Sequence, residues 1–126
     1  MTVKEAIDAA DDVKPNAFTT ATKIAWLNKL EGTIASEVFL MAPAEVQQFK
    51  YTTDDMSAEL LVAAPYDDIY ELYLEAMIDQ KNGEYNKYQN TMQSYNARYA
   101  DFVCWFCQTW DPVQGYMKEE VIYGTV

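Results

Sequence analysis

The chain has 126 residues, and half of them are hydrophobic, which fits a single domain (residues 1–126) with a core of its own. Nine basic and twenty acidic residues give a net charge of −11, which disfavours direct, sequence-specific binding of nucleic acid. No apolar run is long enough to cross a membrane, and the acidic start MTVKEAIDAADD lacks the features of a signal peptide, so we expect a cytoplasmic protein.

The first third of the chain predicts two helices. Thr2 and Glu5 form a T-x-x-E capping box, so a helix is expected over residues 3–11. The chain then breaks before Pro15, because the residue that precedes a proline disfavours helical geometry. A second helix is expected over residues 20–41. Its apolar stripe consists of Ile24, Leu27, Leu30, Ile34, Val38 and Met41.

Residues 43–65, which Pro43 and Pro65 bracket, are the least helical part of the chain. Two groups of strand-forming residues flank a polar turn at residues 53–55. The groups are Val46, Phe49 and Tyr51, and then Leu60, Leu61 and Val62. This pattern is compatible with either a β-hairpin or an extended arm.

The second half of the chain predicts a helix after Pro65, with a stop signal at residues 81–83, where a lysine precedes a glycine. A long helix is expected over residues 84–108. It carries an aromatic ladder with alternating spacings of three and four residues, made of Tyr85, Tyr88, Met92, Tyr95, Tyr99, Phe102 and Phe106. Because the spacing also extends backward into the preceding helix, residues 67–107 form either a helical hairpin or one kinked helix.

A ladder composed mostly of tyrosine suits a surface that packs yet stays partly wet. It indicates either a core-facing helix of a bundle or a helix that meets another subunit along part of its length. Beyond the helix, the tail at residues 111–126 has no helical period, and we expect it to be flexible or ordered by a partner. The predicted fold is therefore mainly α: a small bundle of about four helices, with a long C-terminal helix and an extended arm or β-hairpin in the middle.

Few residues suggest chemistry. The chain has no histidine, which excludes Ser-His and Cys-His catalytic pairs and histidine metal ligands. Cys104 and Cys107 form a C-x-x-C without the two further ligands of a zinc site, so we expect them to pack in the interior. Glu71, Glu75 and Asp79 form a row with a spacing of four, which we interpret as a solvated helix face. We expect no enzyme, no cofactor and no metal.

Acidic residues are concentrated in residues 43–79. This stretch contains nine acidic residues and a single basic one, Lys50. Such a run commonly serves solubility and helix N-terminal charge placement. A functional interpretation is a negative surface that mimics DNA or docks on a basic partner.

Three segments are distinctive: MTVKEAIDAADDVKPNAF, TKIAWLNKLEGTIASEV and ELLVAAPYDDIYELYLEAMIDQKNGEYNKYQNTMQSYNARYADF. Over these segments, roughly residues 1–108, the chain resembles small proteins encoded in prophages of Firmicutes bacteria. Those proteins are similar to head–tail connector (adaptor) proteins of long-tailed phages. The segment VCWFCQTWDP and the tail after it have no counterpart in this resemblance.

The resemblance implies a mainly helical subunit of a ring at the head–tail junction of a virion, made in the bacterial cytoplasm. Its expected partners are further copies of itself and the portal and tail-completion proteins, and no catalytic residues are implied. Acidic residues in such a ring would let DNA slide without sticking. Candidate contacts with a subunit or partner are Phe49, Tyr51, Leu60, Leu61, Tyr116 and Tyr123. The alternative function is an acidic DNA-mimic or regulatory binding protein.

Overall fold

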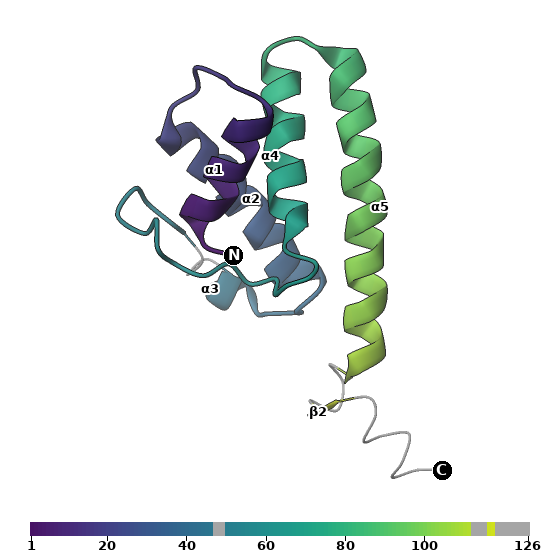
Figure 1. Cartoon of the computed structure of the whole chain (residues 1–126). Helices are drawn as coiled ribbons and strands as arrows, with labels where there is room; N and C mark the ends of the chain where they lie inside the picture. The colour runs from purple at the N-terminus through teal and green to yellow at the C-terminus, as the bar shows by residue number, and fades with distance from the viewer. Residues whose placement is uncertain (47–49, 112–115, 118–126) are drawn as a thin grey trace.

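The computed structural model describes residues 1–46, 50–111 and 116–117, and it is mainly helical, as predicted. Within these residues the elements are α1 (Val3–Val13), α2 (Thr20–Glu37), α3 (Pro43–Val46), α4 (Asp68–Lys81), α5 (Tyr85–Thr109), β1 (Trp110–Asp111) and β2 (Tyr116–Met117). β1 and β2 pair antiparallel directly after α5. Figure 1 shows α1, α2 and α4 clustered together, with α5 running alongside α4 as the longest element.

Local sequence signals set the ends of the first two helices. The capping box is present: the Thr2 hydroxyl accepts a hydrogen bond from the Glu5 amide, and the Glu5 side chain accepts one from the Thr2 amide. α2 ends at Glu37, four residues earlier than predicted. Leu40 has a positive φ of 56°, and the Met41 amide donates a hydrogen bond to the Ala35 carbonyl. The chain therefore leaves the helical path here.

Residues 50–65, which we call the middle segment, contain no β-hairpin within the part of the chain that the structure describes. Among the described residues of 43–65, Glu59 makes an isolated bridge, and its partner is Thr2 at the start of the chain. The amide of Val3 also donates to the carbonyl of Ala58 over 3.0 Å. The first amides of a helix lack partners within the helix, so the middle segment satisfies donors of α1 and lies against the body.

α4 and α5 form the helical hairpin rather than one kinked helix. Gly83 adopts a positive φ of 76°, which glycine tolerates without steric cost. The Glu84 amide donates a hydrogen bond to the Asp79 carbonyl, which closes the end of α4. The two helices lie side by side and antiparallel (Figure 1). The stop signal at residues 81–83 therefore prevails over the continuing ladder spacing.

The aromatic ladder faces the core through most of its length. Tyr95 and Phe102 are buried, and Met92, Tyr99 and Phe106 pack against the same core. The first turn of the ladder differs, since Tyr85 is 65% exposed and Tyr88 is only partly buried. Four helices contribute to the core, whose buried members include Val3, Ile7, Ile24, Leu27, Leu30, Ile34, Ile69, Tyr70, Leu74 and Ile78.

Two expectations about burial were wrong. Glu75 and Asp79 are 9% and 1% exposed, so the acidic row of α4 is not a solvated face. α1 packs on this side of α4 and supplies Lys14 as a partner for Asp79. Conversely, Cys104 and Cys107 are exposed, because they lie on the side of α5 that faces away from the ladder. Among the described residues, no helix is long and apolar enough to span a membrane.

Candidate functional site

The structure describes four of the six predicted contact residues, and these lie in two places. Tyr51, Leu60 and Leu61 lie in the middle segment, with Leu60 buried and the other two partly buried. Tyr116 belongs to β2, and Phe49 and Tyr123 lie outside the described residues. The structure therefore brings three of the six together.

Two of them, Tyr51 and Leu61, donate hydrogen bonds to a buried carboxylate on α2 that sequence analysis missed. Glu31 is fully buried, and its Oε2 accepts hydrogen bonds from the Tyr51 hydroxyl over 2.8 Å and the Leu61 amide over 2.9 Å. Its Oε1 accepts from the Tyr70 hydroxyl over 2.6 Å, and that hydroxyl accepts from the Val62 amide over 2.9 Å. We call these five residues the Glu31 cluster. It joins α2 and α4 to the middle segment.

Burial dominates the electrostatics of the Glu31 cluster. Desolvation raises the pKa of Glu31, although the hydrogen bonds from Tyr70, Leu61 and Tyr51 oppose this shift. Burial and the nearby carboxylate also raise the pKa values of Tyr70 and Tyr51, which keeps both hydroxyls protonated as donors. The sequence carried one signal of this arrangement, because Glu31 falls on the apolar stripe of α2, between Leu27 and Ile34.

A second contact holds the start of the middle segment on α2. The Asn28 side chain donates to the Tyr51 carbonyl over 3.0 Å and accepts from the Tyr51 amide over 2.8 Å. This amide clamp copies the pairing that a neighbouring strand would make. Together with the Glu31 cluster, it fixes the segment against the body at both ends of its described part.

The α1, α4 and α5 helices meet at a second buried charge. Lys14 pairs with Asp79 and donates to the Thr91 hydroxyl over 2.9 Å, and Thr91 also hydrogen-bonds Asp79. A cavity of about 380 Å³ lies beside them, lined by Val13, Lys14, Pro15, Ile78, Asp79, Asn82, Glu84 and Lys87. The acid and its base are already paired, which is typical of a structural tie rather than a catalytic pair.

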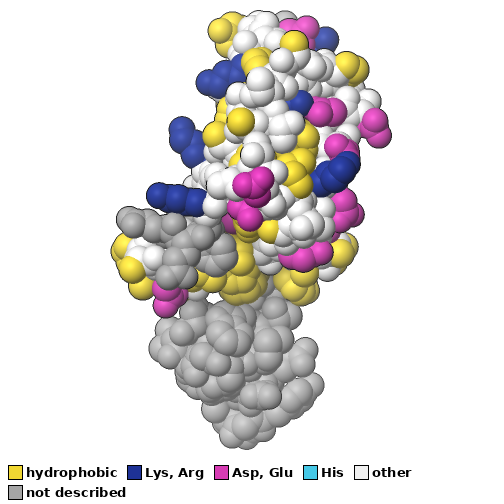
Figure 2. Space-filling model, turned by 90° about the vertical axis from the view of Figure 1, so that its left-hand side faces the viewer, with side chains coloured by type: hydrophobic (Ala, Val, Ile, Leu, Met, Phe, Trp, Pro, Cys, Tyr) yellow, Lys and Arg dark blue, Asp and Glu magenta, His cyan; other side chains and the backbone are white. Residues whose placement is uncertain are grey.

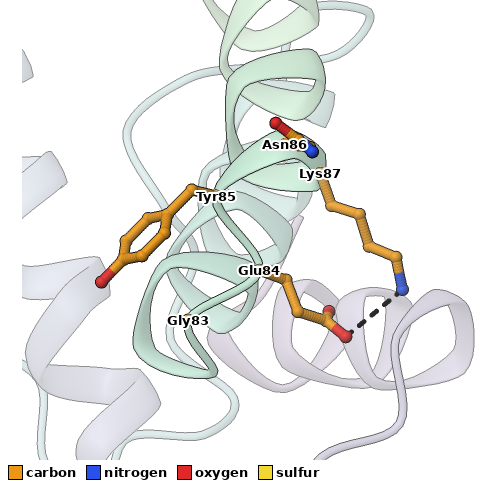
Figure 3. Close-up of a pocket in the computed structure, with 5 residues that line it drawn as sticks. All are labelled: Gly83, Glu84, Tyr85, Asn86 and Lys87. Atoms are coloured by element: carbon orange, nitrogen blue, oxygen red, sulfur yellow. Dashed lines mark hydrogen bonds and ion pairs between the residues drawn. The ribbon is translucent and has the colours of Figure 1, made fainter.

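The turn between α4 and α5 carries a shallow hollow of about 430 Å³ at residues 83–87. Figure 3 shows Lys87 reaching towards Glu84, with 3.4 Å between Nζ and Oε1, while Tyr85 points to the other side. The polar groups therefore do not converge on a common point, as they do in most ligand sites.

The most distinctive surface lies at the C-terminal end of α5. We call it the aromatic end, and it consists of Phe39, Tyr66, Phe102, Trp105 and Phe106. Ring centroids are 4.8 Å apart for Phe39 and Phe106 and 5.2 Å apart for Tyr66 and Trp105. Figure 2 shows hydrophobic side chains gathered at this lower end of the described body.

The aromatic end is partly open to solvent. Trp105 is 36% exposed, and the neighbouring residue of Phe39, Leu40, is 58% exposed. Arg98 lies 4.6 Å from the centre of the Tyr66 ring and binds the Asp68 carboxylate over 2.9 Å, which holds one edge of the surface. Exposed apolar side chains beside an aromatic cluster, with a charged pair at its edge, fit a contact with another protein.

Comparison with known proteins does not assign the chain to a family. No family model, curated protein or solved structure matches the chain. Within the described residues there is also no group of three or more Cys, Asp and Glu side chains placed to hold a metal ion.

Proposed function

We propose that the chain is a structural protein of a phage or prophage, a head–tail connector (adaptor) that joins the portal to the tail through protein–protein contacts. In this proposal, copies of the chain form a ring at the head–tail junction, and the chain is not an enzyme. The main support is a coincidence of boundaries. The resemblance to prophage connector-like proteins covers roughly residues 1–108, and the helical body ends with α5 at Thr109. The resembling part thus ends where the last helix of the packed body ends.

The proposed contact surface combines the aromatic end with the segments beside it. α3, the middle segment and the end of α5 lie in the lower half of the molecule in Figure 1, whereas the α1–α2 and α4–α5 connections lie at the top. Leu40 and Trp105 are the exposed apolar residues at this end. Tyr116 of β2, and Phe49 and Tyr123 outside the described residues, stay predicted contact residues in this proposal.

Tyr51, Leu60 and Leu61 have a different part in the proposal. They are engaged with the chain's own α2 and α4, so they contact a neighbouring subunit when the middle segment leaves the body as an extended arm. The Glu31 cluster is the contact that has to open, and equivalent hydrogen bonds to a neighbour's Glu31 would compensate for it.

The acidic DNA-mimic or regulatory protein has less support. Of the acidic residues in 43–79, Asp68 is paired with Arg98, Asp79 is paired with Lys14, and Glu75 is buried. These three carboxylates are not available to replace the phosphates of DNA, which reduces the charge that a mimic would present.

Binding to the portal ring tests the proposal. We would mix the chain with rings of the portal protein encoded beside it and follow co-sedimentation. The wild type is expected to bind, and Leu40→Asp, which places a charge on the proposed surface, is expected to bind at least tenfold more weakly. Val13→Asp is the matched control, because Val13 is 60% exposed and is the last residue of α1, which contributes nothing to the aromatic end.

Two results would count against the proposal. Failure of the wild-type chain to bind portal rings, with or without tail-completion proteins, would remove the connector function. Equal loss of binding in Leu40→Asp and Val13→Asp would remove the aromatic end as the contact surface.

A further inference from the structure

The exposed side of α5 carries the two cysteines of the chain. Cys104 and Cys107 are three residues apart on a helix, so their side chains are neighbours on one face, about one turn apart. Phe102 and Phe106 occupy the opposite, packed side of the same helix. The pair is therefore a preorganised dithiol held on a rigid, solvent-facing element.

We propose that Cys104 and Cys107 form half of a tetrahedral thiolate site for a soft divalent metal ion such as Zn²⁺. The other half is the same pair of a second copy of the chain, related by a twofold axis. The site thus bridges two α5 helices. This inference does not depend on the connector function.

The ligand count requires the second copy. Structural zinc sites have four nitrogen or sulfur ligands, and two cysteines at a C-x₂-C spacing supply two of them. The chain has no histidine and no further cysteine. In the part of the chain that the structure describes, no third acidic or cysteine side chain is placed to complete the site. A twofold axis duplicates whatever ligands one chain offers, which gives four thiolates.

Among the described residues, the helix turns before the pair present small, exposed side chains on the same face. Ala97 and Ala100 are exposed on the preceding turns and continue the face of Cys104 and Cys107 with spacings of three, four and three residues. That spacing is the seam of a helix pair, and alanine side chains permit the close approach that four sulfur atoms around one ion need.

The chemistry balances without a redox step. Four thiols each release a proton to solvent, and one divalent ion accepts four sulfur lone pairs, which leaves a complex with a net charge of −2. Binding therefore strengthens as pH rises and requires the cysteines to be reduced.

Cobalt titration tests the proposal, because tetrahedral Co²⁺–thiolate sites absorb strongly in the visible range. The full chain, kept reduced, would be titrated with Co²⁺ and then Zn²⁺ while its mass is followed by native mass spectrometry. We expect saturation at one ion per two chains, a metal-dependent dimer, and displacement of Co²⁺ by Zn²⁺.

A matched variant separates chelation from the mere presence of thiols. Ala100→Cys combined with Cys104→Ser keeps two exposed thiols on the same face but moves them two turns apart, about 10 Å along the helix. Two such sulfurs cannot bind one ion, so we expect the absorption and the dimer to be lost while the melting temperature is unchanged.

Three results would overturn the proposal. They are the absence of Co²⁺–thiolate absorption in the wild type, equal binding by the moved-thiol variant, and saturation at one ion per chain with the chain still monomeric.

Discussion

The hydroxyl of Tyr70 donates a 2.6 Å hydrogen bond to Glu31 and accepts one of 2.9 Å from the Val62 amide. One side chain thereby links a buried charge on α2 to the backbone of the middle segment. All three groups are buried, so water cannot replace a lost partner. The stability of the fold and the position of the proposed arm therefore both depend on the Tyr70 hydroxyl.

Removing the Tyr70 hydroxyl is expected to destabilise the fold. Tyr70→Phe leaves an oxygen of Glu31 and the Val62 amide without this partner, which costs about 2 kcal/mol of unfolding free energy. Tyr99→Phe is the matched control, because the Tyr99 hydroxyl is buried with no hydrogen-bond partner among the described residues. Its removal is expected to be neutral or stabilising. Urea denaturation measures both variants, and equal destabilisation would contradict this account.

Hydrogen exchange would show where Tyr70→Phe acts. The amides of Leu61 and Val62 are expected to exchange faster in the variant, because their acceptors belong to the Glu31 cluster. Amides in the middle of α5 are expected to change less. Uniform acceleration across all helices would mean that the variant lowers global stability without releasing the middle segment.

The raised pKa of Glu31 predicts a pH dependence of stability. Between its ordinary value of 4.5 and the higher value in the fold, the native state binds more protons than the unfolded chain. The unfolding free energy contributed by this group therefore falls as pH rises through that window, and it is constant above the folded pKa. Glu31→Gln cannot titrate, so wild type minus variant isolates the effect. A difference that stays constant between about pH 5 and pH 8 would contradict the prediction.

Breaking the Lys14–Asp79 pair is expected to cost more stability than breaking a surface pair. Lys14→Met leaves the buried Asp79 carboxylate without its cation and should cost about 3 kcal/mol. Replacing both residues, as Lys14→Met with Asp79→Leu, should restore much of the loss. Lys4→Met removes an exposed pair with Asp8 and should change little. Similar melting temperatures for Lys14→Met and Lys4→Met would refute this assignment.

Features governed by neighbouring residues were predictable from the sequence. The Thr2–Glu5 capping box and the glycine stop at Gly83 act within one helical turn, and the structure contains both. The aromatic ladder also predicted a core-facing helix, since helical spacing alone decides which residues share a face. The early end of α2 was not predictable, because Leu40 is an unusual residue for a positive φ.

Features governed by distant partners were missed. Asp79 is buried because Lys14, 65 residues away in the chain, reaches it, and no local pattern marks that pairing. Glu31 likewise accepts a hydrogen bond from Tyr70, which is 39 residues away in the chain, so no local pattern marks this contact either. The cysteines were expected inside because cysteine is usually buried, but the packed side of α5 was already occupied by the ladder.

The central claim is that the chain belongs to the virion at the head–tail junction. The most direct measurement is quantitative mass spectrometry of purified phage particles induced from the source strain. The account predicts a stoichiometric signal in tailed particles and in filled heads that carry the connector, and its loss from heads without a connector. Absence of the chain from intact tailed particles, with abundant chain in the same lysate, would contradict the claim.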